Sequence, residues 1–172
     1  MSASPTPYTE PWLRGTHEDV PAAGRAVLHA LELAQDDLEK WTDGLSDAEM
    51  HAQPLGLTSI AQQLRHIAGS IDRILTYAEG NQLSADQLAA MKAEAAGAET
   101  LSELLARLRE ALAQAAKRVR ALSTADLGVP RSVGRKQLPT SLGGALIHVA
   151  DHTQRHVGQV VTTAKVIKAL RR

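Results

Sequence analysis

Three histidines spaced four residues apart are the part of this 172-residue chain best suited to chemistry. His148, His152 and His156 lie in the segment LIHVADHTQRHVGQVV. A step of four residues turns an α-helix by only about 40° beyond a full turn, so the three imidazoles project from one side. Neighbouring rings lie about 5 to 6 Å apart at Cβ, close enough to converge on one cation. The spacing predicts a divalent-metal site, with a row of hydrogen-bonded or solvated histidines as the alternative.

The residues around this row favour coordination. Val149, Val157 and Val160 predict that part of the segment is buried. Stacked imidazoles in a core cannot all become charged without a large cost, and binding a cation uses their neutral form. Thr153 stands where a zinc protease of the HExxH type would have its glutamate base, so that class of enzyme is excluded.

Two histidines of one helix make an incomplete site, so a third ligand must come from another helix. His66, in the middle of SIAQQLRHIAGSIDRILTY, is the best candidate; the alternative is a buried histidine that bonds a backbone carbonyl. His29, between apolar residues of the first helix, is a weaker candidate. We expect His17 and His51, in polar or irregular segments, to be solvated.

Other polar residues could assist the site. His148 lies one turn before the pair and could support a ligand from behind, which we favour, or act as a fourth ligand. Gln159 falls on nearly the same face as His152 and could hydrogen-bond a ligand or substrate, or serve helix packing. Arg131 and Arg135 precede the last helix and are either solvated charges or, if their loop covers the site, contacts for an anionic substrate.

Four long helices are predicted to position these residues. Apolar periodicity and breaker residues place them from near Asp19 to before Gly44, from Thr58 or Ser59 to Gly80, from Thr100 to Leu122, and from near Thr140 to about Leu170. Capping boxes mark the start of the third (Thr100 with Glu103) and of two short helices (Ser46 with Glu49, Ser84 with Gln87).

The connections between helices indicate the topology. The segment 80–97 is longer than the 2 to 8 residues that usually join antiparallel bundle helices. It can carry the chain back along the bundle, so we expect an all-α four-helix bundle with one long crossover and parallel second and third helices. The segment 123–139 is expected to be a basic, irregular loop whose role stays open.

Composition excludes several classes of function. Nineteen basic and nineteen acidic residues give no net charge, whereas a duplex-DNA binder normally has a basic excess. The absence of cysteine excludes disulfides, thiolate nucleophiles and cysteine-based zinc sites. No apolar run approaches the ~18 residues of a membrane span, and the start of the chain does not resemble a secretory signal. We expect one cytoplasmic domain over 1–172, with 1–18 as an extended N-terminal arm; a homodimer is plausible because the last helix carries apolar residues.

The two histidine segments together resemble the DinB-like superfamily. LRHIAGSIDRILTY and LIHVADHTQRHVGQVV match its second and fourth helices, and the superfamily includes the YfiT-type metal-dependent enzymes. In that family a histidine of the second helix and an HxxxH pair before a Gly-Gln step bind a divalent metal. The resemblance implies that His66, His152 and His156 are the ligands, with Gly158 and Gln159 as the Gly-Gln step. The family includes thiol-dependent transferases and a maleylpyruvate isomerase.

Three neutral histidines leave the remaining positions of a Zn²⁺, Ni²⁺, Fe²⁺ or Mn²⁺ ion to water or substrate, and we favour Zn²⁺ or Ni²⁺. Such an ion lowers the pKa of a bound water or thiol toward neutrality. We therefore expect an enzyme that uses a low-molecular-weight thiol or water on a small-molecule substrate, as an S-transferase or a hydrolase. A non-catalytic metalloprotein, or a helical interaction module with an empty site, is the alternative. No motif places a catalytic side chain.

Overall fold

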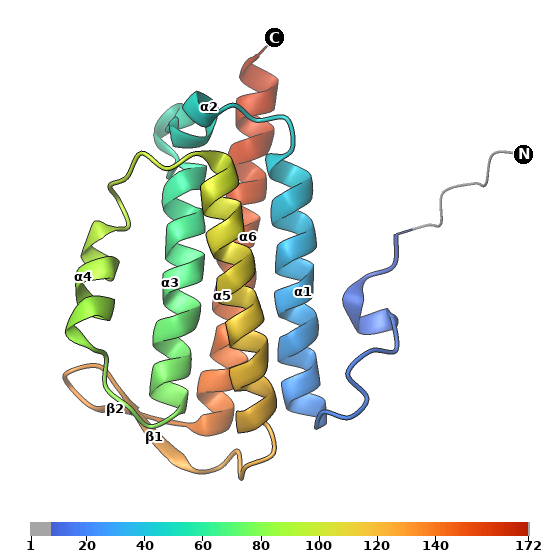
Figure 1. Ribbon diagram of the computed structural model, residues 1–172, viewed down its shortest axis with the longest axis vertical. Helices are drawn as coiled ribbons and strands as arrows, with labels where there is room; N and C mark the ends of the chain where they lie inside the picture. Colours follow the sequence, from blue (N-terminus) through green and yellow to red (C-terminus); the bar gives the residue numbers. More distant parts are fainter. Residues whose placement is uncertain (1–7, 172) are drawn as a thin grey trace, which may run out of the picture.

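The chain folds mostly into α-helices. The computed structural model describes residues 8–171, and within them it contains six α-helices, one β-hairpin and two short 3-10 helices (Figure 1). The α-helices are α1 (Ala22–Thr42), α2 (Asp47–His51), α3 (Ile60–Ala78), α4 (Ala85–Ala93), α5 (Leu101–Leu122) and α6 (Leu142–Leu170). The hairpin pairs β1 (Pro130–Val133) with β2 (Leu138–Ser141), and the 3-10 helices are η1 (Pro11–Leu13) and η2 (Pro54–Gly56). The expected all-α class is confirmed.

Most helix starts follow from the capping residues. In α2, α4 and α5 the predicted capping box is complete, with each side chain bonded to the other residue's backbone N–H (Ser46 with Glu49, Ser84 with Gln87, Thr100 with Glu103). The hydroxyl of Ser59 accepts a hydrogen bond from the Gln62 N–H at the start of α3. These side chains satisfy donors that a helix leaves unpaired in its first turn, which is why the sequence predicts the starts well.

Two helix starts differ from the prediction. The first helix begins at Ala22, not near Asp19, because Pro21 has an extended backbone and is the N-cap residue. The last helix begins at Leu142, not near Thr140, because Thr140 pairs with Arg131 in the hairpin and Ser141 caps the helix. The expected irregular loop over 123–139 therefore contains a strand pair.

The hairpin closes the lower end of the bundle. Its turn uses positive φ angles at Gly134 and Gln137, and Gln137 accepts a hydrogen bond from the Ser132 hydroxyl. Arg131 donates to the carbonyl oxygen of Ala78 in the last turn of α3. Arg131 thus caps the last turn of α3, at the end of the helix away from His66, and does not cover the histidine site.

The core lies between α1, α3, α5 and α6. Each contributes fully buried apolar side chains, among them Leu38, Ile67, Leu108 and Val149. In Figure 1 α1 and α6 run upward, while α3 and α5 run downward. Polar contacts agree with this direction, since Arg65 near the start of α3 bonds Glu99 just before α5, and Arg118 near the end of α5 bonds Glu79 just after α3.

The crossover between α3 and α5 is held by polar contacts. Its helix α4 lies beside α3 on the outside of the bundle and has no buried residue. The Gln87 amide donates to Asp72 and Thr76 of α3, and the Arg73 guanidinium bonds Glu94 at the end of α4. The crossover is therefore attached at a few named points and not by an apolar interface.

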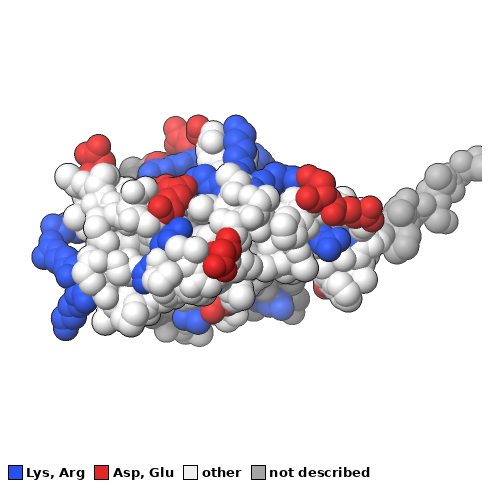
Figure 2. Space-filling model, turned by 90° about the horizontal axis from the view of Figure 1, so that it is seen from below, with Lys and Arg blue, Asp and Glu red and all other residues white. Residues whose placement is uncertain are grey.

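The described part of the expected N-terminal arm packs along α1. Tyr8 and Arg14 both bond the carboxylate of Asp36, so residues 8–18 are anchored to the bundle; residues 1–7 lie outside the described residues. Seen from below, acidic and basic side chains are interspersed over the end of the bundle, with wide uncharged areas between them (Figure 2). Within residues 8–171, no helix combines the length and apolar character needed to cross a membrane.

Candidate metal centre

Neighbouring helices α3 and α6 bring three histidines together. His66 of α3 and His152 and His156 of α6 each offer a ring nitrogen, and these nitrogens lie within 4.8 Å of one another. The ring centroids of His66 and His156 are 4.3 Å apart, and those of His152 and His156 are 4.5 Å apart. The Nε2 atoms of His66 and His152 face each other at 3.1 Å. One cation can therefore be reached by all three rings.

The outer nitrogens of two of these rings, His66 and His156, are bonded to oxygen atoms. His66 Nδ1 lies 2.8 Å from a carboxylate oxygen of Glu94. His156 Nδ1 lies 2.8 Å from the amide oxygens of both Gln63 and Gln159. An oxygen acceptor fixes the proton on Nδ1 and leaves the lone pair on Nε2, which is the tautomer a metal ligand needs. The donor set thus fits a divalent cation that prefers imidazole.

Burial keeps two of the three rings neutral. It lowers the pKa of His152 to about 4, with smaller contributions from the neighbouring charges of His156 and His66. Burial also lowers the pKa of His156, again with a contribution from His66. Both rings are therefore deprotonated near neutral pH, so a cation does not have to displace a proton from them. The side chain of His66 keeps 28% of its surface exposed, which leaves the group accessible.

Glu94 holds His66 from the end of the crossover. Its second carboxylate oxygen lies 2.6 Å from Arg73 of α3, and its side chain is only 13% exposed. Gly69 makes this arrangement possible, because a Cβ there would lie 2.7 Å from the Arg73 guanidinium and 2.9 Å from Glu94. A carboxylate behind a metal-binding imidazole fixes its orientation and raises its basicity.

Three supporting residues were not predicted from the sequence. Glu94 and Arg73 carry no recognisable motif, and Gln63 looks like an ordinary polar residue of α3. The one available signal is the helical spacing of Gln63 and His66, three residues apart, which places them on one face of α3. Glu94 has no such relation, since it belongs to another element.

The two assisting candidates of α6 have different surroundings. Gln159 contacts His156 directly, as described above. His148 lies next to His152, with ring centroids 5.2 Å apart, but it is outside the group of three. Its Nδ1 pairs with Asp151 at 2.8 Å and about half of its side chain is exposed. In this arrangement His148 is a neighbour of the site rather than a fourth ligand.

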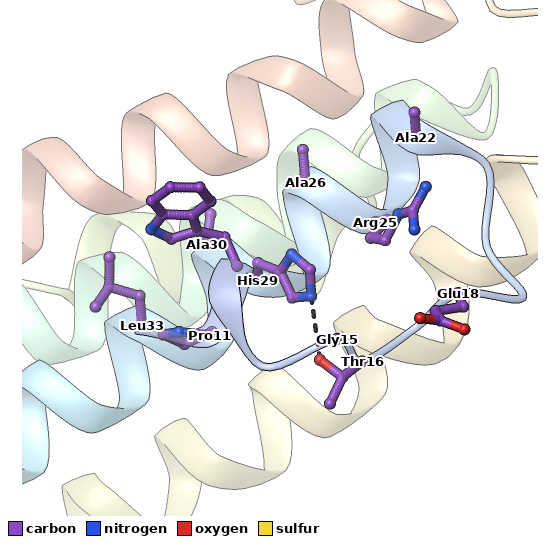
Figure 3. Close-up of a pocket in the computed structure, with 11 residues that line it drawn as sticks. Pro11, Gly15, Thr16, Glu18, Ala22, Arg25, Ala26, His29, Ala30 and Leu33 are labelled. Carbon is purple, nitrogen blue, oxygen red and sulfur yellow. Dashed lines mark hydrogen bonds between the residues drawn. The ribbon is translucent and has the colours of Figure 1, made fainter. Parts of the chain in front are cut away.

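The remaining histidines have partners of their own. His29 of α1 belongs to a second group with His17 and Glu32, all offering ligand atoms within 4.8 Å. Figure 3 shows His29 directed toward Thr16 along a cavity of about 480 Å³, with Nε2 3.1 Å from the hydroxyl. His17 and His51 are not solvated as expected: His17 bonds Glu32 and Arg120, and His51 bonds the backbone carbonyl of Glu99. These partners are distant in sequence, so the polar residues near His17 and His51 wrongly predicted that both histidines are solvated.

A smaller cavity opens next to the two glutamines that bond His156, and none of the three histidines lines it. It has a volume of about 300 Å³ and lies between α6 and the start of α3. Gln63 and Gln159, which both bond His156, line it together with Arg155 and Gly158. A small molecule in this cavity would therefore contact the two glutamines that bond His156, on the Nδ1 side of that ring.

Comparison with known proteins gives one family. The profile of the DinB superfamily matches residues 30–160, which include α3, the crossover and all three histidines. No curated protein matches the chain at a significant level.

Proposed function

Because the chain belongs to the DinB superfamily, we propose that it is a metal-dependent enzyme in which His66, His152 and His156 hold one divalent cation. One observation carries the proposal. The outer nitrogens of His66 and His156 bond oxygen acceptors, which leaves a lone pair on Nε2 of both rings, and Nε2 of His66 faces Nε2 of His152 at 3.1 Å. Ordinary buried histidines have no need for such an arrangement, since one hydrogen bond to a backbone carbonyl would satisfy each.

The residues of the site have two kinds of role, as ligands of the cation and as supports of those ligands. His66, His152 and His156 would hold the cation, while Glu94 orients the ring of His66 and Gln63 and Gln159 orient that of His156. Three protein ligands leave at least one position of a cation open to a small molecule. A bound cation supplies charge that lowers the pKa of a thiol or a water molecule and so provides a nucleophile near neutral pH.

We infer a small-molecule substrate and, as the nucleophile, a low-molecular-weight thiol or water. Transfer to the thiol would make the protein an S-transferase, and attack by water would make it a hydrolase. Imidazole suits Zn²⁺, Ni²⁺, Fe²⁺ and Mn²⁺ to different degrees, and we favour Zn²⁺ or Ni²⁺ because the site has no carboxylate ligand. The cavity beside Gln63 and Gln159 provides room for the substrate.

The decisive experiment uses Co²⁺ as a spectroscopic probe. The purified protein is stripped of metal, loaded with Co²⁺ and titrated with 2-mercaptoethanol or azide while the visible and near-ultraviolet spectrum is recorded. We expect a thiolate-to-cobalt charge-transfer band that saturates, and no cobalt loading in His156→Ala. A cobalt spectrum that neither probe changes would indicate a closed structural site and refute the enzymatic proposal.

A further inference from the structure

Arg155 is an arginine without a protein partner. Within residues 8–171 most arginines form ion pairs, whereas Arg155 makes neither a salt bridge nor a side-chain hydrogen bond. It directly precedes His156 in α6 and lines the cavity of about 300 Å³ beside Gln63 and Gln159. A guanidinium placed in this way is free to bind an anion.

The cavity around Arg155 contains no acidic side chain. It is lined by Leu57, Thr58, Gln63, Arg155, Gly158, Gln159, Thr162 and Thr163. Arg155 is its one charged residue, and the others are apolar or neutral hydrogen-bonding groups. The lining therefore matches a molecule that carries a single negative charge.

The amide NH₂ groups of Gln63 and Gln159 are two further hydrogen-bond donors, and contacts with His156 set their orientation. The amide oxygens of Gln63 and Gln159 both accept from His156 Nδ1, which commits the oxygen side of each amide. Neither amide NH₂ group has a hydrogen-bond partner among the described residues, and both side chains line the cavity. Two amide NH₂ groups and one guanidinium are thus available as donors around the same space.

Gly158 keeps the backbone of α6 open at this place. Glycine is less favourable than alanine inside a helix, so its presence calls for a reason. Packing within the protein does not supply one, because no atom lies within 4 Å of the position that a Cβ would take. Without a side chain at Gly158, a molecule bound in the cavity could approach the backbone of α6 closely.

We propose that this cavity binds the carboxylate group of a small organic substrate, with Arg155 and the amide groups of Gln63 and Gln159 as its partners. The proposal rests on the proposed function, since it takes the bound molecule to be the substrate. A carboxylate matches the planar fork of arginine and the single positive charge, whereas a phosphate dianion would carry excess charge. The volume of about 300 Å³ limits the substrate to a small molecule.

The test uses metal-free protein, so that it does not depend on the cation. Benzoate, acetate and inorganic phosphate are titrated separately into ¹⁵N-labelled protein, and backbone amide shifts are followed by NMR. We expect saturable shifts centred on Gly158 and Thr162 with benzoate and acetate. Arg155→Gln should weaken this binding about ten-fold, as the loss of a charge-assisted hydrogen bond predicts, and Arg155→Lys should weaken it less.

Arg25 provides a matched control. It also lacks a salt bridge and a side-chain hydrogen bond within residues 8–171, but it lines the other cavity, beside His29. Arg25→Gln should leave carboxylate binding unchanged. Shifts that are equal in wild type and Arg155→Gln, that centre on residues around Arg25, or that are stronger for phosphate than for benzoate would overturn the proposal.

The two proposals can fail separately. If the protein binds benzoate at Gly158 but never loads Co²⁺, the metal-dependent function is wrong and the carboxylate site stands as a binding site. If Co²⁺ loads and responds to 2-mercaptoethanol but benzoate does not bind, the carboxylate site is wrong. Gly158→Ala adds a second readout, since it should raise the melting temperature and weaken benzoate binding together.

Discussion

The group of His66, His152 and His156 and the group of His17, His29 and Glu32 both bring three ligand atoms within 4.8 Å. They differ in what surrounds the rings. In the first group the outer nitrogens of His66 and His156 donate to oxygen atoms, so that Nε2 of each ring keeps its lone pair. In the second, Arg120 donates to His17 Nδ1 at 2.6 Å, which places the ring proton on Nε2, where it is donated to Glu32 at 2.6 Å.

The second group therefore has no free lone pair on His17, and it has a guanidinium in contact with the ring. His29 is bonded to the hydroxyl of Thr16. These contacts attach residues 16–17 to α1 and to the end of α5. Proximity of histidines alone therefore does not define a metal site. The acceptors or donors on the far side of each ring decide between a cation ligand and a structural clamp.

The largest expected difference between the groups is in metal content. His66→Ala and His156→Ala should each reduce bound Zn²⁺ or Ni²⁺ from about one ion per chain to near zero, because two imidazoles do not complete the site. His17→Ala and His29→Ala should keep the full content. Elemental analysis of the purified variants measures both. Retention of metal by His156→Ala, or its loss in His17→Ala, would reverse the assignment of the two groups.

A second difference concerns the carboxylates. Glu94→Gln keeps the shape of the side chain but removes the charge behind His66, so the affinity for Zn²⁺ should fall about ten-fold. Glu32→Gln, the matched change in the other group, should not alter it. Competition with a chromophoric chelator measures both affinities. Equal affinities in wild type and Glu94→Gln would show that the carboxylate does not support the ligand.

A third difference appears on acidification of the metal-free protein. The pKa of His152 is lowered to about 4 from its usual 6.5, first by burial and then by neighbouring positive charge. Below pH 6.5 the unfolded chain therefore binds more protons than the folded one. The free energy of unfolding decreases as the pH is lowered from 6.5, and this decrease levels off near pH 4. Urea unfolding across this range should show a flatter pH dependence for His152→Gln. Profiles of equal slope would contradict the lowered pKa.

The smallest effect is expected from weakening the clamp. His17 has a positive φ of 59°, a conformation that asparagine tolerates, so His17→Asn removes the side-chain contacts without adding backbone strain. Its contacts are partly exposed, and the free energy of unfolding should fall by about 1 kcal/mol. Urea titration measures this change, and zinc affinity should be unaffected. A loss of zinc affinity would mean that the clamp also shapes the metal centre.

Much of the fold could be predicted because its signals are local. Ser59, Thr100 and Ser84 cap helices through bonds to residues three positions away, and the apolar faces repeat with the helix period. The hairpin over 130–141 was missed because its strands are four residues each and contain basic and polar residues. Such segments carry no clear alternation, and tertiary contacts such as that of Arg131 with Ala78 stabilise them.

The three histidines that the structure brings together could be singled out in the sequence, but the residues that bond them could not. The spacing of His152 and His156 predicts a shared face, and the family resemblance adds His66. Glu94 bonds His66 across 28 positions of sequence, and Arg120 bonds His17 across 103. No periodic pattern reports a contact between elements that meet only in the folded bundle. The contacts that distinguish the two histidine groups can therefore be found only in the folded structure.

The placement of Glu94 has a consequence for how fast an ion could exchange. Glu94 follows α4, the helix without a buried residue, and a few polar contacts hold this crossover against α3. Elements with little buried apolar surface detach at a lower free energy than the bundle as a whole unfolds. Detachment of the crossover would free the imidazole of His66 to rotate, and an ion could leave or arrive while the four long helices stay assembled. Turnover of the ion would then follow the local opening of one outer segment, on a timescale much shorter than that of global unfolding.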